Sequence, residues 1–414
     1  MSDVIVVGAG PAGAATAIFL AERGLDVLVL DRAAFPRPKL CGEYLSPEAA
    51  RLLDRLGVLK ALDVAGAVPL GGMRITAPDG TVVVGRYRPV DGWRPYRDHA
   101  LAIPRETLDA TLADRLRALP IDFRERMRVT DVLVEAGQVV GVEAVDANGA
   151  SHRFRAPLVV AADGRASVVA HRLGLHRAHR LQRMAIVTYL SGLGDVSDLG
   201  EIFVDPPDYA ILNPVAPGRV NMSIVVPLAH AAPFSDRLDT FFAARVSQLR
   251  HLARRVSGAE VVARVRALGP LAYRVAAPTM GGVMLVGDAA GFYDPFTGEG
   301  VFTGLRSAEL AAETATTAVR SGDCSAAALA AYTRSRHAVF AGKERLTRAL
   351  QLIIRHRHLA NLAARMLTRR PALLDLVLGA IGDFVPPGAV LSRRAFSTWG
   401  APGAPQAPHA SGRT

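Results

Sequence analysis

Residues 3–31, DVIVVGAGPAGAATAIFLAERGLDVLVLD, contain the pattern that decides the fold. The run DVIVVG predicts a short strand. The segment AGAATAIFLAERG has helical spacing and ends at Gly24, and LDVLVLD predicts a second buried strand. A strand, a tight turn, a helix and a second strand in this order form a parallel βαβ unit. The segment therefore predicts an α/β domain at the start of the chain.

The turn of this unit reads Gly8-Ala9-Gly10-Pro11-Ala12-Gly13. Gly8 permits a tight turn, Gly10 lets the backbone approach a pyrophosphate, and Gly13 lets the helix pack closely on the strand. Asp31 ends the second strand, where its carboxylate can accept a hydrogen bond from a ribose hydroxyl. This is the Rossmann-like pattern for a dinucleotide without a 2′-phosphate. The candidate binding residues are Gly8, Gly10, Ala12, Gly13, Asp31 and Arg32.

Two more strands end in an aspartate beside a glycine. LVVAADG ends in Asp163-Gly164, which by itself could be any junction between a strand and a turn. VMLVGDAAGFYDPFTGEG ends a strand at Gly287-Asp288 and then forms a glycine-rich loop before a helix. Asp288 can accept hydrogen bonds from a polyol, and the free amides of the helix can stabilise the negative charge of a reduced flavin. A flexible loop at a helix start is the alternative reading.

These three turns, in this order, resemble the para-hydroxybenzoate-hydroxylase-like flavoprotein superfamily over roughly residues 1–320. The resemblance implies that FAD is the cofactor and that Asp163 lies near it. It also implies that Asp288 binds the ribityl chain. Arg105, in AIPRETLD, matches a basic residue that contacts FAD in that superfamily, although a solvated salt bridge is an equal alternative. The residues expected from the last loop are Gly287, Asp288, Pro295, Gly298, Gly300 and Val301.

Within this superfamily, FPRPKLCGEYLSPEA (35–49) and the loop after residue 286 look like the geranylgeranyl reductase family. That likeness implies that Cys41 and Gly42 lie beside the flavin and that the substrate is a long prenyl chain. Cys41, Glu43 and Tyr293 are the candidate catalytic residues. The flavin-dependent halogenases have a Trp-x-Trp-x-Ile-Pro signature that is absent here, because Trp93 and Trp399 are isolated. Halogenation is therefore disfavoured.

The expected fold class is α/β: a Rossmann-like FAD-binding domain, an inserted and mainly antiparallel β substrate domain, and a helical C-terminal part. We expect the FAD-binding domain to comprise residues 1–174 and 276–345, with a β-hairpin region in its first part. The substrate-binding insert is expected at 175–275 and the helical region at 346–400. Residues 401–414 are rich in proline, glycine and alanine, so we expect a disordered tail.

Composition narrows the function classes further. The chain has 49 Lys+Arg and 38 Asp+Glu, a net charge of +11, but it has no basic run with interleaved aromatics, so nucleic acid is not an expected partner. Two cysteines and no signal-peptide pattern indicate a cytoplasmic protein. The basic segment from 345 to 378 is amphipathic. It could lie on a membrane surface, although two ordinary packed helices are the simpler reading.

His356 and His358 cannot share a helix face, so no metal site is expected. The oligomeric state stays open. The leading hypothesis is an FAD-dependent oxidoreductase, with NAD(P)H as electron donor, that reduces a C=C bond in a hydrophobic small molecule. The alternatives are a single-component monooxygenase, which would hydroxylate a phenol or polyketide, and a flavin-binding partner protein without turnover.

Overall fold

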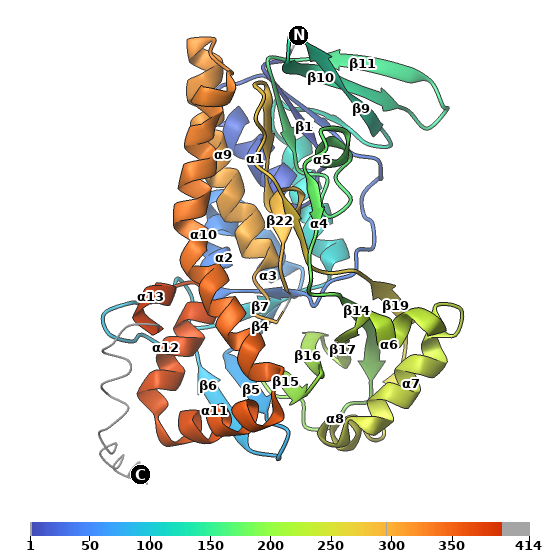
Figure 1. Ribbon diagram of the computed structural model, residues 1–414, viewed down its shortest axis with the longest axis vertical. Coiled ribbons are helices and arrows are strands. Elements are labelled where there is room, and N and C mark those ends of the chain that lie inside the picture. The colour runs from blue at the N-terminus through green and yellow to red at the C-terminus, as the bar shows by residue number, and fades with distance from the viewer. Residues whose placement is uncertain (1, 295, 391–414) are drawn as a thin grey trace.

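The computed structural model describes residues 2–294 and 296–390. Its upper part in Figure 1 is built on a parallel sheet with the strand order β21-β12-β1-β2-β8. Every residue of the four strands other than β8 is buried, and the predicted strands at residues 3–8 and 25–31 are confirmed as β1 and β2. The bounds are β1 (Val4–Val7), β2 (Val27–Leu30), β8 (Asp122–Arg124), β12 (Leu158–Ala161) and β21 (Val283–Leu285). The α/β fold class is confirmed.

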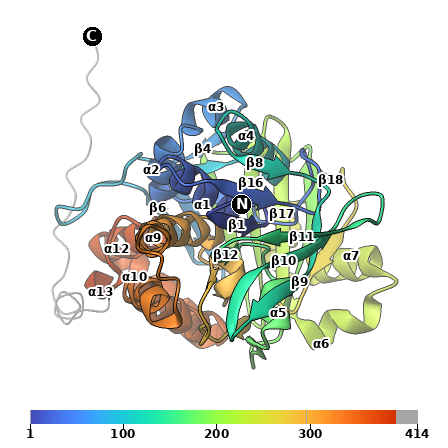
Figure 2. The same ribbon diagram turned by 90° about the horizontal axis from the view of Figure 1, so that it is seen from above.

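The two faces of this sheet are covered differently. Val4 and Val6 of β1 pack with helices on one face, whereas Ile5 and Val7 pack against the antiparallel sheet β11-β10-β9 on the other. Figure 2 shows both coverings from above. The elements on the helical face are α1 (Pro11–Ala21), α2 (Pro47–Arg55), α3 (Leu59–Val64), α4 (Arg105–Arg117) and α9 (Gly300–Ser321). Those on the opposite face are β9 (Arg128–Glu135), β10 (Gln138–Val145), β11 (Ser151–Arg155) and α5 (Val168–Arg172).

A second sheet lies below the first and provides the wall of the candidate site. Its strand order is β18-β14-β17-β16-β15-β5-β6, and β19 pairs with β14. All its pairings are antiparallel except the parallel contact of β15 with β5. The sheet therefore extends beyond residues 175–275, because a hairpin from before residue 90 joins its edge. The bounds are β5 (Gly72–Thr76), β6 (Val82–Arg86), β14 (Arg183–Ser191), β15 (Leu199–Asp205), β16 (Asp208–Ala216), β17 (Arg219–Pro227), β18 (Glu260–Val261) and β19 (Arg266–Leu268).

Two small three-stranded sheets join the two larger ones, with the orders β3-β7-β4 and β13-β20-β22. Their strands are β3 (Tyr44–Leu45), β4 (Val68–Leu70), β7 (Ala100–Ala102), β13 (His176–Ala178), β20 (Tyr273–Val275) and β22 (Gly291–Phe292). Short helices flank the second sheet: α6 (Leu228–Ala231), α7 (Leu238–Gln248) and α8 (Arg250–Arg255). The joining sheets bring the segments near residues 44, 102 and 292 to the boundary between the two halves of the molecule.

The C-terminal part is helical to residue 390. The long helix α10 (Ala326–Ile354) runs beside α9 and reaches the lower end of the molecule, where α11 (Arg357–Arg369) and α12 (Pro371–Ile381) pack against β6 (Figure 1). The short helix α13 (Pro387–Val390) contacts α10 and α12. None of the helices in residues 2–294 and 296–390 is long and apolar enough to cross a membrane. The predicted tail at 401–414 lies outside the described residues.

Candidate active site

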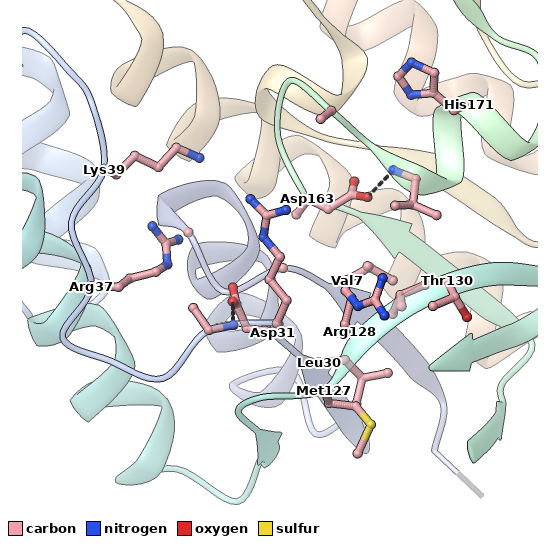
Figure 3. Close-up of a pocket in the computed structure, with 18 of the residues that line it drawn as sticks. Val7, Leu30, Asp31, Arg37, Lys39, Met127, Arg128, Thr130, Asp163 and His171 are labelled. Carbon is pink, nitrogen blue, oxygen red and sulfur yellow. Dashed lines mark hydrogen bonds between the residues drawn. The ribbon is translucent and has the colours of Figure 1, made fainter. Parts of the chain in front are cut away.

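A cavity of about 850 Å³ lies where β1, β2 and β12 end. Its wall includes Gly8 and Gly10 of the glycine turn, Asp31 after β2 and Asp163 after β12. Figure 3 shows Arg37 and Lys39 entering from one side of this cavity, and Arg128, Thr130 and His171 from the other. The carboxyl ends of neighbouring parallel strands form the usual ligand-binding edge of such a sheet. Two of the three predicted aspartate turns therefore meet at one cavity.

The glycine turn has two positions without room for a side chain and a third, Gly10, where the backbone stays accessible to a ligand. Gly8 has φ +96°, and a Cβ atom at Gly13 would lie 1.8 Å from the carbonyl oxygen of Gly8. By contrast, a Cβ at Gly10 would meet only Arg37 Nη2, at 3.8 Å. Gly10 is the N-cap of α1, so the first free amides of that helix lie beside the cavity. Free amides at a helix N-terminus are a suitable site for a phosphate anion.

Asp31 is buried and binds one main-chain amide in the glycine turn and another after β2. Its Oδ2 accepts from the N–H of Ala9 at 2.7 Å, and its Oδ1 accepts from the N–H of Ala33 at 2.8 Å. The carboxylate therefore holds the glycine turn against the end of β2. Each oxygen keeps a second lone pair, which is available to a hydroxyl donor. Arg32 is exposed and lines the same cavity.

Asp163 supplies a polar group that lacks a partner in the described part of the chain. Its Oδ2 accepts from the N–H of Val168 at 2.7 Å, but its Oδ1 is buried without a hydrogen bond. Burial raises the pKa of this carboxyl, although hydrogen bonds from Ser167 and Val168 oppose the shift. A buried acceptor without a donor is costly, so a ligand donor at this position would stabilise the site.

A second, apolar cavity of about 200 Å³ continues from the first. Both are lined by Gly10, Lys39 and Ala162, so they meet at the N-terminus of α1. The walls of the second cavity come mostly from the lower sheet and the 292–301 loop: Met73, Ala185, Val187, Ile202, Ile211, Val225, Leu268, Leu271, Phe292, Phe296 and Val301. Eight further predicted cofactor residues also line it: Ala12, Cys41, Gly42, Arg105, Gly287, Asp288, Gly298 and Gly300. Gly13 lines neither cavity.

The third turn meets the first at this cavity. A Cβ at Gly287, which has φ +56°, would lie 2.7 Å from Cβ of Ala12. The Asp288 carboxylate makes no hydrogen bond to any described residue and lines the cavity, so it is available to a polyol. Burial raises the pKa of Asp288, while the charges of Lys39 and Arg105 oppose that shift. Gly298, with φ +68°, packs on the Tyr44 ring, where a Cβ would meet Cδ1 at 2.5 Å.

Gly300 begins α9, and Val301 in its first turn is buried. The preceding residue, Glu299, lies between the loop and α10 with its side chain 13% exposed, and Lys343 Nζ lies 3.4 Å from its Oε1. Asp383 pairs with the same lysine. These contacts fix the start of α9 at the cavity. The predicted cofactor residue Pro295 lies outside the described residues.

Glu43 joins the two halves of the molecule. Its Oε1 accepts from the N–H of Arg105 at 2.9 Å and from the hydroxyl of Tyr189 at 2.7 Å. Its Oε2 accepts from the Asn221 amide at 3.1 Å. Burial raises the pKa of Glu43, against hydrogen bonds from these three groups that lower it. The carboxylate thus fixes the loop, with Glu43 in a left-handed conformation at φ 56°.

The neighbouring residues of this loop are held in the same way. Asn221 donates to the carbonyl oxygen of Cys41 at 3.0 Å, and Asn213 donates to that of Gly42 at 2.8 Å. The Cys41 thiol is free and partly exposed at the cavity, and its sulfur accepts from the N–H of Glu43 at 3.3 Å. The sequence did not indicate these two asparagines or Tyr189. They lie about 150 to 180 residues away, and isolated polar residues in a strand carry no signal of their partner.

Arg105 is buried and makes two hydrogen bonds of 2.9 Å to the Asp109 carboxylate. Burial alone lowers the pKa of Arg105, but the charge of the Asp109 carboxylate outweighs it and the pKa is raised. The solvated salt bridge that the sequence left open is therefore wrong, because the pair is buried one helical turn apart at the cavity. Arg105 is a fixed positive charge next to the Cys41 sulfur.

The candidate catalytic residue Tyr293 does not line the apolar cavity. It lies on a neighbouring cavity of about 290 Å³, with its ring edge-on to His179 and the ring centroids 5.3 Å apart. That cavity shares Asp288, Phe292 and Gly300 with the apolar one. The sequence could not show on which side of the glycine-rich loop the Tyr293 ring lies. No group of three or more metal-ligating side chains occurs among the described residues.

Comparison with known proteins identifies the family. Residues 1–347 match the family described as FAD binding domain. The chain belongs to this FAD-binding family. It is 33% identical over 330 residues to a menaquinone reductase of Mycolicibacterium smegmatis, covering 75% of this chain and 76% of the relative. It is 28% identical over 336 residues to a digeranylgeranylglycerophospholipid reductase of Methanosarcina acetivorans, covering 78% of this chain and 77% of the relative.

Among solved structures, a flavin-dependent brominase has the same fold. Its TM-score is 0.80 at 21% sequence identity, over 96% of this chain and 98% of that one. The predicted resemblance to the para-hydroxybenzoate-hydroxylase-like superfamily and the geranylgeranyl reductase family is confirmed. The chain is an FAD-dependent oxidoreductase, and the alternative of a flavin-binding protein without turnover is wrong.

Proposed function

We propose that this FAD-dependent oxidoreductase reduces a C=C bond in an isoprenoid-like hydrophobic molecule, with NAD(P)H as the electron donor. The observation that carries the proposal is the junction of the two cavities at Gly10, Lys39 and Ala162. One cavity has the amides and carboxylates suited to a dinucleotide, and the other has the aliphatic walls suited to a prenyl chain. The names of the two reductase relatives support the same substrate class.

In this proposal the three turns hold FAD from end to end. The glycine turn, Asp31 and Arg32 would bind the ADP half, and Asp163 and Asp288 would accept hydrogen bonds from FAD hydroxyl groups. The α9 N-terminus at Gly300 would face the ring, where its free amides stabilise negative charge. Bound FAD would supply the hydride for the reduction.

The protein's own contribution to the reduction is to orient the substrate, exclude water and hold a proton. The aliphatic walls of the lower sheet would bind the prenyl chain and keep water out. We propose that the Cys41 thiol holds the proton that completes the reduction, because it is the free thiol at this cavity. Glu43 would then be a positioning residue, since its carboxylate is occupied by three hydrogen bonds. A catalytic role for Tyr293 stays a prediction, because that ring lines the adjacent cavity.

The test is turnover under anaerobic conditions. The protein is reconstituted with FAD, reduced with NADPH, NADH or dithionite in parallel, and mixed with a menaquinone or a geranylgeranyl lipid. Saturation of a double bond without oxygen, detected by mass spectrometry, supports the proposal. Substrate hydroxylation that requires oxygen would instead assign the protein as a monooxygenase. Reduction by dithionite but by neither nucleotide would reject NAD(P)H as the donor.

A Cys41→Ser variant tests the proton assignment. We expect slower substrate reduction but an unchanged rate of FAD reduction by the donor. Equal slowing of both half-reactions would contradict a role limited to proton delivery.

A further inference from the structure

Helix α11 turns two leucines, Leu359 and Leu362, toward solvent, whereas its Leu367 packs toward the core. Leu359 is 41% exposed and Leu362 is 64% exposed, whereas Ala360 and Ala364 are each 6% exposed. A helix at the surface of a soluble protein normally has the opposite arrangement, with leucines toward the core. Met366, partly exposed, lies one helical turn beyond Leu362 on the same face. We call Leu359, Leu362 and Met366 the outer stripe.

Polar contacts fix the rotation of α11, so the helix cannot turn to bury this stripe. Arg357 donates to Asp205 at 2.5 Å at the end of β15. Asn361 accepts from the N–H of Asp79 at 3.1 Å, and Arg365 donates to the carboxylate of Asp79 at 2.6 Å. These partners lie at the end of β15 and in the turn between β5 and β6. Small alanines on the inner face let the helix approach the protein closely.

The surroundings of the outer stripe are positively charged. His358 and Arg369 lie on α11 beside the stripe, Arg355 lies two residues before the helix at the C-cap of α10, and all three are exposed. None of the three makes an ion pair with any residue in 2–294 or 296–390, and α11 contains no acidic residue. An apolar stripe with a basic border on a helix is typical of a segment that lies in the interface of an anionic membrane. A second copy of the chain would instead bring like charges together.

We propose that α11 docks the protein on an anionic lipid surface. The outer stripe would enter the boundary between headgroups and acyl chains, and Arg355 and Arg369 would face lipid phosphates. Contact is peripheral, because no helix in the described part of the chain can span a bilayer. Figure 1 places α11 at the lower end of the molecule, away from the cavity at the ends of β1 and β2. The inference does not rest on the proposed reductase reaction.

The experiment is cosedimentation of the FAD-loaded full chain with vesicles. One set contains phosphatidylserine and phosphatidylcholine, and the other contains phosphatidylcholine alone. We expect binding to the anionic set that weakens as salt is added. The variant Leu359→Ser/Leu362→Ser should bind at least about tenfold more weakly, because the two leucine side chains are no longer transferred from water into the membrane. The matched control is Val261→Ser/Val262→Ser, which changes two valines of 53% and 51% exposure outside α11 and should bind like the parent.

A charge variant, Arg355→Gln/Arg369→Gln, should weaken binding to the anionic vesicles several-fold and leave the bound-FAD spectrum unchanged. Equal binding of the leucine variant and the parent would overturn the proposal, as would failure of the parent to bind anionic vesicles. Size-exclusion chromatography with light scattering tests whether a second copy of the chain binds the outer stripe instead. A parent dimer that becomes a monomer in the leucine variant would assign the face to self-association and overturn the lipid proposal.

Discussion

Replacement of Gly10 and Gly13 by alanine should separate the folding role of the glycine turn from its ligand role. The two residues are three positions apart in one turn, yet their surroundings differ. A Cβ at Gly13 would lie 1.8 Å from the Gly8 carbonyl oxygen, so the backbone itself must move. A Cβ at Gly10 has 3.8 Å to its nearest neighbour, the flexible end of Arg37. Gly10 also has φ −69° and ψ −179°, a conformation that alanine adopts without strain.

The expected magnitudes follow from these distances. Gly13→Ala should lower the free energy of unfolding of the apoprotein by at least about 3 kcal/mol, the upper range for overpacking of a core. Gly10→Ala should change it by no more than about 1 kcal/mol. FAD affinity should nevertheless fall about tenfold to a hundredfold in Gly10→Ala, because the new methyl group occupies the space where the diphosphate approaches the backbone.

Two measurements check this prediction. Urea denaturation of the apoproteins gives the two stability changes, and quenching of FAD fluorescence during titration gives the affinity. The reasoning is refuted if Gly10→Ala binds FAD as tightly as the parent, or if it is destabilised as much as Gly13→Ala. The first result would mean that the diphosphate does not approach the α1 N-terminus.

Further predictions concern the carboxylates of Glu43 and Asp163. Glu43→Ala should lower the free energy of unfolding by about 3–5 kcal/mol, because the donors on Arg105, Tyr189 and Asn221 lose their acceptor. Glu43→Gln should lower it by only about 1 kcal/mol. Urea denaturation distinguishes the two variants, and equal losses would contradict the hydrogen-bond argument. Since the folded pKa of Glu43 is raised above the usual 4.5, the parent should lose stability relative to Glu43→Gln as pH rises from about 4.5 through the folded pKa. A constant stability difference over that range would exclude this titration. Asp163→Asn should keep apoprotein stability within about 1 kcal/mol, because the amide oxygen can still accept from Val168, but should weaken FAD binding; unchanged affinity in the fluorescence titration would remove Asp163 from the site.

The turns were predictable because their constraint is local. Gly8 needs a positive φ and Gly13 needs the absence of a Cβ within one turn of six residues, so glycine spacing alone reports the geometry. The fully buried strands β1 and β2 were predictable for a similar reason, since their apolar runs are continuous. Each of these features depends on residues that are neighbours in the sequence.

The parallel pairing of β15 with β5 was not predictable, because it joins residues about 125 positions apart through one edge of a sheet. The turns that follow β5 and β15 join each strand to its antiparallel neighbour and give no signal of this pairing. The same limit applies to the hydrogen bonds of Glu43 with Tyr189 and Asn221. A polar residue in a strand indicates that a partner exists, but the partner's identity depends on how the sheet is placed.

Ala12 shows where local and distant constraints meet. Within its own turn it occupies a variable position of the glycine pattern, and nothing in the first 31 residues requires a small side chain there. In the folded chain its Cβ lies 2.7 Å from the position of a Cβ at Gly287 and 3.4 Å from that of a Cβ at Gly304. A larger residue at position 12 would push the third turn and α9 away from the first turn. The size of this one side chain therefore helps to set how closely the first and third turns can approach each other. This explains why the loop from 287 to 300 needs glycine at its first position.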